Sequence, residues 1–344
     1  MWWVLILAAG LWGLGILLRL TNWLRLAMIG VLWLAVLLAV LVLPVGNGLR
    51  RALGGEVRVW LVLGGVVVLG LGDWEVVRRL RRRAAPAEVP ASGAFRAAEL
   101  DRYARHILLR EIGGPGQRKL KDSKVLVVGA GGLGSPALLY LAASGVGVIG
   151  VIDDDQVEAS NLQRQIIHTD QRIGMAKVLS AAIAMRALNP FIEVRTDRRR
   201  LSEANAAAVL ASYDLILDGS DNFDTRYMVN RVAVGLGKPL IAAAITQWEG
   251  QISLYDPAHG GPCFECVFPV RPAPGMVPSC AEAGVAAPLP GVIGAMMGLE
   301  AVKFLTGAGE GLRGRLLIYD GLFSECRVIG VKRREGCAVC GASA

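Results

Sequence analysis

Val125-Leu126-Val127-Val128-Gly129-Ala130-Gly131-Gly132-Leu133-Gly134 is the stretch of this 344-residue chain that decides its fold. The apolar run 125–128 predicts a strand, and the glycines after it predict a tight turn into a helix over 135–144. Glycines let a backbone approach phosphate closely, and a helix N-terminus offers unpaired N–H groups. The stretch therefore indicates the first strand, turn and helix of a nucleotide-binding α/β unit.

Further strands and helices alternate along the chain after this unit. They are expected at 148–153, 177–188, 192–195, 203–211 and 215–218. This order predicts a doubly wound, mainly parallel, Rossmann-like sheet with helices on both faces. Asp153 ends the second strand, where an acidic side chain can bind a ribose hydroxyl. Taken alone, the glycine loop and Asp153 would also suit a NAD-dependent oxidoreductase.

The N-terminal part of the chain is almost wholly apolar and raises the mean hydropathy to +0.47. Apolar runs at 2–18 and 26–43 approach the length that crosses a hydrocarbon core of roughly 30 Å. A third run, 53–71, spans only if Arg58 lies near one face. Two or three transmembrane helices are therefore expected within residues 1–75. A cleaved signal peptide is the alternative, but no basic residue precedes Arg19.

Basic charge is concentrated in the same part of the chain. Up to Ala94 there are ten Lys and Arg against four Asp and Glu, and after it 27 against 25. Five arginines follow the last apolar run: Arg78, Arg79, Arg81, Arg82 and Arg83. The positive-inside rule puts them on the cytoplasmic side. We expect a multi-pass inner-membrane protein whose cytoplasmic catalytic domain follows a basic juxtamembrane segment and linker over 76–94. The near-neutral remainder favours no nucleic-acid partner.

Four more sequence blocks accompany the glycine loop in a fixed order. They are Arg102-Tyr103-Ala104-Arg105-His106-Ile107, Ser160-Asn161-Leu162-Gln163-Arg164-Gln165, Gly174-Met175-Ala176-Lys177 and Ser220-Asp221-Asn222. Together, the blocks closely resemble the ThiF/MoeB/HesA family of E1-like adenylyltransferases, and are most similar to its MoeB (molybdopterin-synthase adenylyltransferase) type. The resemblance runs from about Phe95 to Gly341, so a family domain is expected over 95–344.

The resemblance implies an enzyme that uses ATP and Mg²⁺ to adenylate the C-terminal glycine of a ubiquitin-like sulfur carrier of the MoaD or ThiS type. Pyrophosphate is released, and the acyl-adenylate serves sulfur transfer to molybdopterin or thiamine. Arg164 and Lys177 are implied to bind the phosphates of ATP, because cations there stabilise the negative charge that develops on the phosphate oxygens. Asp221 is implied to bind magnesium, and Arg105 to reach in from the partner subunit of a homodimer. The other implied ATP positions are Gly129, Gly131, Gly132, Gly134, Asp153, Ser160, Asn161, Leu162, Gln163 and Asn222.

Four of the six cysteines form two closely spaced pairs. Cys263 and Cys266 form one Cys-x-x-Cys pair, and Cys337 and Cys340 form another. Four thiolates make a closed tetrahedral zinc site, so a structural Zn²⁺ is expected, and disulfides are the alternative that a cytosolic domain disfavours. By resemblance, Cys280 occupies the position of a conjugating cysteine and is a candidate nucleophile. We predict that Cys326 packs in the core or a strand and that His106, His168 and His259 are structural.

Other functions stay open on the sequence alone. A relative of the tRNA threonylcarbamoyladenosine dehydratase type would use the same adenylation on a small carboxylate. A non-catalytic membrane protein that docks a carrier, or the oxidoreductase above, would use the fold differently. Some family members carry a rhodanese-like extension, which is not found after Cys340. The expected sulfur source is therefore a separate donor, such as a cysteine desulfurase or a rhodanese.

Overall fold

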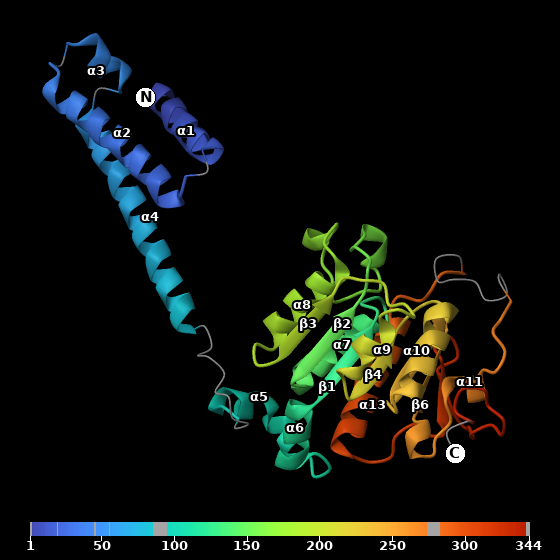
Figure 1. Ribbon diagram of the computed structural model, residues 1–344. Helices are drawn as coiled ribbons and strands as arrows, with labels where there is room; N and C mark the ends of the chain where they lie inside the picture. The colour runs from blue at the N-terminus through green and yellow to red at the C-terminus, as the bar shows by residue number, and fades with distance from the viewer. Residues whose placement is uncertain are drawn as a thin grey trace. The chain divides into compact units, whose positions relative to one another are not determined.

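The structure is a computed structural model that describes residues 2–18, 20–44, 46–54, 56–84, 95–273 and 283–341. It forms two compact units, Met1–Glu88 and Val89–Ala344 (Figure 1). The first contains only helices among its described residues, and the second contains the sheet. Residues 85–94 of the predicted juxtamembrane segment and linker, and the candidate nucleophile Cys280, lie outside the described residues.

The described residues of the N-terminal unit form four helices. These are α1 (Trp2–Leu17), α2 (Asn22–Val42), α3 (Gly48–Ala52) and α4 (Val57–Ala84). Both α1 and α4 pack against α2. The absence of a side chain at Gly64 lets the Trp33 ring lie against α4, since a Cβ there would sit 2.3 Å from a ring carbon. The Trp33 indole N–H donates to the Trp60 carbonyl at 3.1 Å and ties the two helices together.

The helices of this unit differ in part from the apolar runs of the sequence. Helices α1 and α2 cover the first two runs, and 24–42 within α2 has a mean hydropathy of 2.5. The third range, 53–71, is not a separate helix, because α3 ends at Ala52 and α4 continues through the basic run to Ala84. By length and composition, only α2 and α13 (Leu289–Thr306) among the described helices could cross a membrane. Helix α13 packs on α7 (Gly134–Ser144) and on strands of the sheet, so it belongs to the core of the second unit.

The described part of the second unit is built on one sheet of eight strands. They are β1 (Lys124–Val128), β2 (Val148–Ile152), β3 (Glu193–Asp197), β4 (Leu215–Asp218), β5 (Leu240–Thr246), β6 (Glu249–Tyr255), β7 (Arg315–Asp320) and β8 (Glu325–Gly330). The strand order is β3-β2-β1-β4-β5-β6-β7-β8. Strands β1 to β5 pair in parallel, and β6, β7 and β8 follow on the β5 side, each antiparallel to the strand before it. The expectation of a mainly parallel α/β sheet is confirmed.

Helices cover both faces of the sheet. Helices α7 (Gly134–Ser144), α8 (Lys177–Leu188) and α13 share one core layer, and α9 (Ala206–Ala211) and α10 (Phe223–Gly235) share the other. Strand β1 alternates between the layers, because successive side chains of a strand point to opposite faces. Val125 and Val127 enter the first layer, and Leu126 and Val128 enter the second.

The described part of this unit also contains shorter helices. They are α5 (Ala97–Ile107), α6 (Gly113–Asp122), α11 (Phe264–Val267) and three 3₁₀ turns, Ala159–Asn161, Asp170–Arg172 and Pro257–His259. The predicted elements match to within a few residues, with β3 starting at Glu193 and α9 at Ala206. The antiparallel half was not expected. Cys326 does lie in a strand, but it is exposed on the edge strand β8 and not in the core.

Candidate functional site

A cleft of about 900 Å³ opens at the carboxyl ends of the parallel strands. It lies where the strand order reverses between β1 and β4, which is the usual ligand position in a doubly wound sheet. Its lining includes eight of the predicted residues: Gly129, Gly131, Gly132, Asp153, Arg164, Lys177, Asp221 and Asn222. Residues from four separate sequence blocks are thus brought to one cavity.

The glycine loop forms the floor of the cleft. Gly129 has a φ of +92°, which side-chain-bearing residues rarely adopt. A Cβ at Gly134 would sit 1.9 Å from the Gly129 carbonyl oxygen, so the first turn of α7 can close only on a glycine. Gly131 has open space instead, since its nearest neighbour would be Gln165 Nε2 at 3.8 Å. Gly134 therefore shapes the loop from below, whereas Gly131 faces the space a ligand would fill.

Asp153 connects the end of β2 to the glycine loop. Its Oδ2 accepts from the Ala130 N–H at 2.8 Å, and its Oδ1 accepts from the Asp155 N–H at 2.9 Å. Burial raises the pKa of the Asp153 carboxyl, and the Ala130 N–H and the charge of Lys177 act against this. Each carboxylate oxygen keeps a free lone pair. Asp153 can therefore shape the loop and still accept a hydroxyl hydrogen bond.

Lys177 lies at the start of α8 and reaches the cleft from its buried side. Its Nζ is 2.7 Å from Asp155 Oδ2, and the exposed fractions of the two side chains are 8% and 65%. The Lys177 backbone N–H donates to the Asp155 carbonyl at 3.0 Å, which fixes the start of the helix beside the end of β2. The Lys177 ammonium group is thus largely shielded from water, whereas the Asp155 carboxylate is solvent-exposed.

Arg164 lines the other side of the cleft. Its Nη1 donates to the Ser160 carbonyl at 3.1 Å, so the guanidinium is partly oriented by its own turn. Four neighbouring predicted positions, Ser160, Asn161, Leu162 and Gln163, form this turn and are not among the described residues that line the cavity. Asn161 Oδ1 accepts from the Glu158 N–H at 3.2 Å, which gives it a role in the turn. Their contacts to ATP stay predictions.

The segment after β4 is held by buried polar groups. Asp218 Oδ1 accepts from the Ser220 N–H at 2.9 Å, and Arg226 donates from Nη2 to the Ser220 carbonyl. Asn222 caps α10, because its side chain accepts from the Thr225 N–H at 2.9 Å. Asp221 stands exposed between these anchors and faces the cleft. A carboxylate in this position can take a divalent cation.

Arg105 lies away from these groups. It is exposed near the end of α5 and is not among the described residues that line the cavity of its own chain. The resemblance assigned it to a partner's site, and this assignment stays a prediction.

The cleft suits a polar, anionic ligand. Gln165 Oε1 and Ser220 Oγ are buried, line the cleft and have no hydrogen-bond partner within the described part of the chain. Buried polar atoms need partners, and a nucleotide would supply both donors and acceptors. Arg164, Lys177 and Arg226 supply positive charge, and the grouped carboxylates of Asp153, Asp154 and Asp155 fit a hard cation.

Several residues that line the cleft carry no clear signal in the sequence. Gln165 was in a matched block but received no role, and Arg226 follows Asn222 by four residues, which is one helical turn. Arg199, Arg200 and Gln251 come from segments without any motif. Only the three-dimensional arrangement identifies them.

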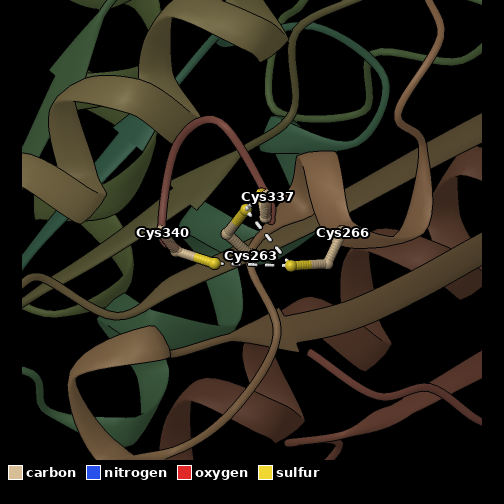
Figure 2. Close-up of side chains that lie close together, drawn as sticks. All are labelled: Cys263, Cys266, Cys337 and Cys340. Carbon is tan, nitrogen blue, oxygen red and sulfur yellow. Dashed lines mark hydrogen bonds between the residues drawn. The ribbon is translucent and has the colours of Figure 1, made fainter. Parts of the chain in front are cut away.

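The four paired cysteines meet in one cluster (Figure 2). The Sγ atom of Cys263 lies 3.7 Å from that of Cys266 and 3.6 Å from that of Cys337. The Sγ atoms of Cys266 and Cys340 are 3.4 Å apart. Tetrahedral zinc with Zn–S bonds of about 2.3 Å places sulfurs about 3.8 Å apart. A disulfide would need about 2.05 Å. All four cysteines are free, so the donor set and spacing fit zinc.

Backbone geometry prepares this cluster for a cation. Burial alone raises the pKa of the Cys337 thiol, but N–H groups of Cys340 and Val339 donate to its sulfur and lower the pKa to about 6. Burial raises the pKa of Cys263. The Gly341 N–H donates to the Cys337 carbonyl at 2.8 Å, and a Cβ on Gly341 would sit 2.5 Å from that oxygen. The turn therefore requires glycine directly after Cys340.

Fold and sites together define a Rossmann-like nucleotide-binding protein with a second, four-cysteine centre. The chain belongs to the ThiF family, whose pattern matches residues 103–339.

Individual relatives agree with this assignment. The sulfur carrier protein adenylyltransferase of Thermus thermophilus is 50% identical over 71% of this chain and 91% of its own length. The SAMP-activating enzyme E1 of Haloferax volcanii is 47% identical over 71% and 90%. Among solved structures, E. coli MccB with ATP has a TM-score of 0.61 at 25% identity, covering 70% of this chain and 74% of that one.

Proposed function

We propose that this chain adenylates the C-terminal glycine of a ubiquitin-like sulfur-carrier protein with ATP and releases pyrophosphate. The observation that carries the proposal is the single cleft in which the glycine loop, Arg164, Lys177 and Asp221 meet. The names of the relatives, a sulfur carrier adenylyltransferase and an activating enzyme, support the same reaction.

The residues act on charge and position. A glycine carboxylate oxygen attacks the ATP α-phosphorus, and the bond from that phosphorus to the bridging oxygen of the leaving pyrophosphate breaks. Arg164 and Lys177 stabilise the negative charge that builds on the phosphate oxygens. Lys177 is effective because it is nearly dry, and charges interact more strongly where water is excluded. Asp221 would hold Mg²⁺, which offsets the triphosphate charge.

The test is ATP–pyrophosphate exchange with a carrier that ends in Gly-Gly. Arg164→Ala and Asp221→Ala should each lower exchange by about 100-fold or more, which is typical for loss of a charge-stabilising group. Arg195→Ala is the matched control, because Arg195 pairs with Glu193 on the far edge strand β3. Undiminished exchange in both site variants, or binding of NADH in place of ATP, would refute the proposal.

The active assembly is proposed to be a homodimer that exchanges Arg105. Support comes from the exposed position of Arg105, away from its own cleft. Mixing inactive Arg105→Ala and Arg164→Ala chains forms heterodimers in which one site has both arginines, so exchange should recover. Failure to recover in confirmed heterodimers would exclude this arrangement.

The N-terminal unit is proposed to anchor the enzyme to a membrane, with the catalytic unit in the cytoplasm. Support comes from the apolar, mostly exposed helix α2 and the basic run at the end of α4. After carbonate extraction the full chain should stay in the membrane pellet. A protein found wholly in the supernatant would refute the anchor. Sulfur is proposed to come from a separate donor such as a cysteine desulfurase or a rhodanese.

A further inference from the structure

Ala130, in the middle of the glycine loop, is held by hydrogen bonds at both its backbone N–H and its carbonyl oxygen. Its N–H donates to Asp153 Oδ2 at 2.8 Å, and its carbonyl oxygen lies 2.9 Å from His168 Nε2. A carbonyl oxygen can only accept, so Nε2 must carry the proton and donate. Ala130 is fully buried and His168 is 5% exposed, so water does not compete for this bond.

A second buried contact orients the His168 ring. Nδ1 lies 2.9 Å from Ser180 Oγ, and with Nε2 protonated the Ser180 hydroxyl donates to it. Ser180 is buried on α8, the helix that begins at Lys177. Burial lowers the pKa of His168, and the positive charges of Lys177 and Arg172 lower it further. Burial and these charges favour the neutral ring, and the contacts to Ala130 and Ser180 orient it.

This bond determines where the next N–H points. The chain has no cis peptide bonds in its described part, so the Gly131 N–H points opposite to the Ala130 carbonyl across one planar group. The carbonyl faces buried His168, which leaves the Gly131 N–H directed away from it. Gly131 lines the cleft, and its N–H makes no hydrogen bond to any described residue. The glycines on both sides of Ala130 carry no side chain that could fix this orientation.

We propose that His168 is a positioning residue for ATP: by holding the Ala130 carbonyl on the buried side, it turns the Gly131 N–H into the cleft as a phosphate donor. The proposal rests on the proposed function, since it needs a phosphate in this cleft. His168 touches no substrate atom and acts only through the loop backbone. Without the Nε2 donor, the Ala130–Gly131 peptide loses the hydrogen bond that sets its orientation, and the Gly131 N–H is no longer preset.

Three variants of His168 separate positioning from packing. Gln carries an amide N–H near the place of Nε2 and should keep the bond to Ala130. Asn places its amide near Nδ1, so it reaches Ser180 and not Ala130, and Leu fills the volume with no donor. Ser180→Ala is the matched control, because it removes the contact to Nδ1 and leaves Ala130 untouched.

Binding of ATP with Mg²⁺ by calorimetry and the KM for ATP in pyrophosphate exchange are the readouts, with melting temperature as a stability check. We expect His168→Leu and His168→Asn to weaken ATP binding by about tenfold or more, because hydrogen bonds to charged groups are strong. His168→Gln and Ser180→Ala should stay within about threefold of the parent. If Leu does not fold, the contrast between Gln and Asn gives the same answer.

The outcomes distinguish this inference from the function beneath it. Equal ATP affinity in the Gln and Asn variants overturns the positioning role, even if exchange activity is normal. A parent protein that does not bind ATP overturns both. A parent that binds ATP and shows the predicted order of affinities, but exchanges with no carrier, supports the positioning role and refutes carrier adenylation.

Discussion

Lys177 Nζ and Asp155 Oδ2 lie 2.7 Å apart, yet the lysine side chain is 8% exposed and the aspartate side chain 65%. The pair is unequal, because the ammonium is buried and its counter-charge can be hydrated. An incoming phosphate can replace Asp155 as the partner of Lys177 at small cost, since the released carboxylate returns to water. The ion pair holds the ammonium group of Lys177 at the cleft.

Lys177→Met should therefore reduce catalysis without unfolding the protein. The methionine fills the buried volume, and Asp155 left alone is solvated, so the melting temperature should change by only a few degrees. Exchange should fall by about 100-fold or more, with the loss mainly in kcat if Lys177 contacts charge that develops in the transition state. A rise in KM with an unchanged kcat would show instead that Lys177 serves ground-state binding.

Two glycines of the loop should respond oppositely to alanine. Gly134→Ala places a methyl 1.9 Å from the Gly129 carbonyl oxygen, and this backbone clash should destabilise the domain by about 1–3 kcal/mol or more. Gly131→Ala meets nothing closer than 3.8 Å and should leave stability unchanged while it weakens ATP binding. Denaturant unfolding and calorimetry check both. Equal stability of the two variants would contradict the loop geometry.

The parallel half of the sheet was predictable because its strands are continuous apolar runs between helices, as in Val125 to Val128. The antiparallel half was not. Strand β8 is exposed along its whole length, so it lacks the apolar alternation that marks a half-buried strand. Its pairing with β7 is set by the tertiary fold.

The site residues likewise divide into those that the sequence makes recognisable and those that it does not. Arg164, Lys177 and Asp221 were recognisable because they lie in sequence blocks with a family resemblance. Arg226 was not, because its contact to the Ser220 carbonyl depends on how α10 turns back over the end of β4. The chemistry of His168 was equally hidden, since its partners Ala130 and Ser180 are 38 and 12 residues away in the chain.

Loss of a cluster cysteine should remove a metal and destabilise the fold. Cys337→Ser is expected to reduce bound zinc from about one ion per chain and to lower the melting temperature strongly, because structural zinc contributes directly to folding. Cys326→Ser is the control, since Cys326 is exposed on β8 and outside the cluster. Metal content by mass spectrometry and thermal unfolding are the measurements. Unchanged zinc and stability in Cys337→Ser would exclude the site.

The neutral state of His168 predicts a pH dependence of stability. Burial lowers its folded pKa, the charges of Lys177 and Arg172 lower it further, and the hydrogen bond to the Ala130 carbonyl acts against the shift. The unfolded chain, with an ordinary histidine pKa of about 6.5, then binds the proton more readily than the folded one. The stabilising contribution is complete above about pH 7 and is lost as the pH falls below about 6.5 towards the folded pKa. His168→Gln has no such titration.

Guanidinium unfolding of the parent and of His168→Gln at pH 7.5, 6.5 and 5.5 isolates this effect, because all other titrating groups are shared. The parent should lose stability relative to the variant on acidification, by up to about 1.4 kcal/mol per pH unit within that window. Parallel curves would mean that the ring titrates normally in the folded protein. In that case protonation of Nδ1 would turn it into a donor towards Ser180, whose hydroxyl can rotate to accept, and the bond from Nε2 to Ala130 would persist in both charge states.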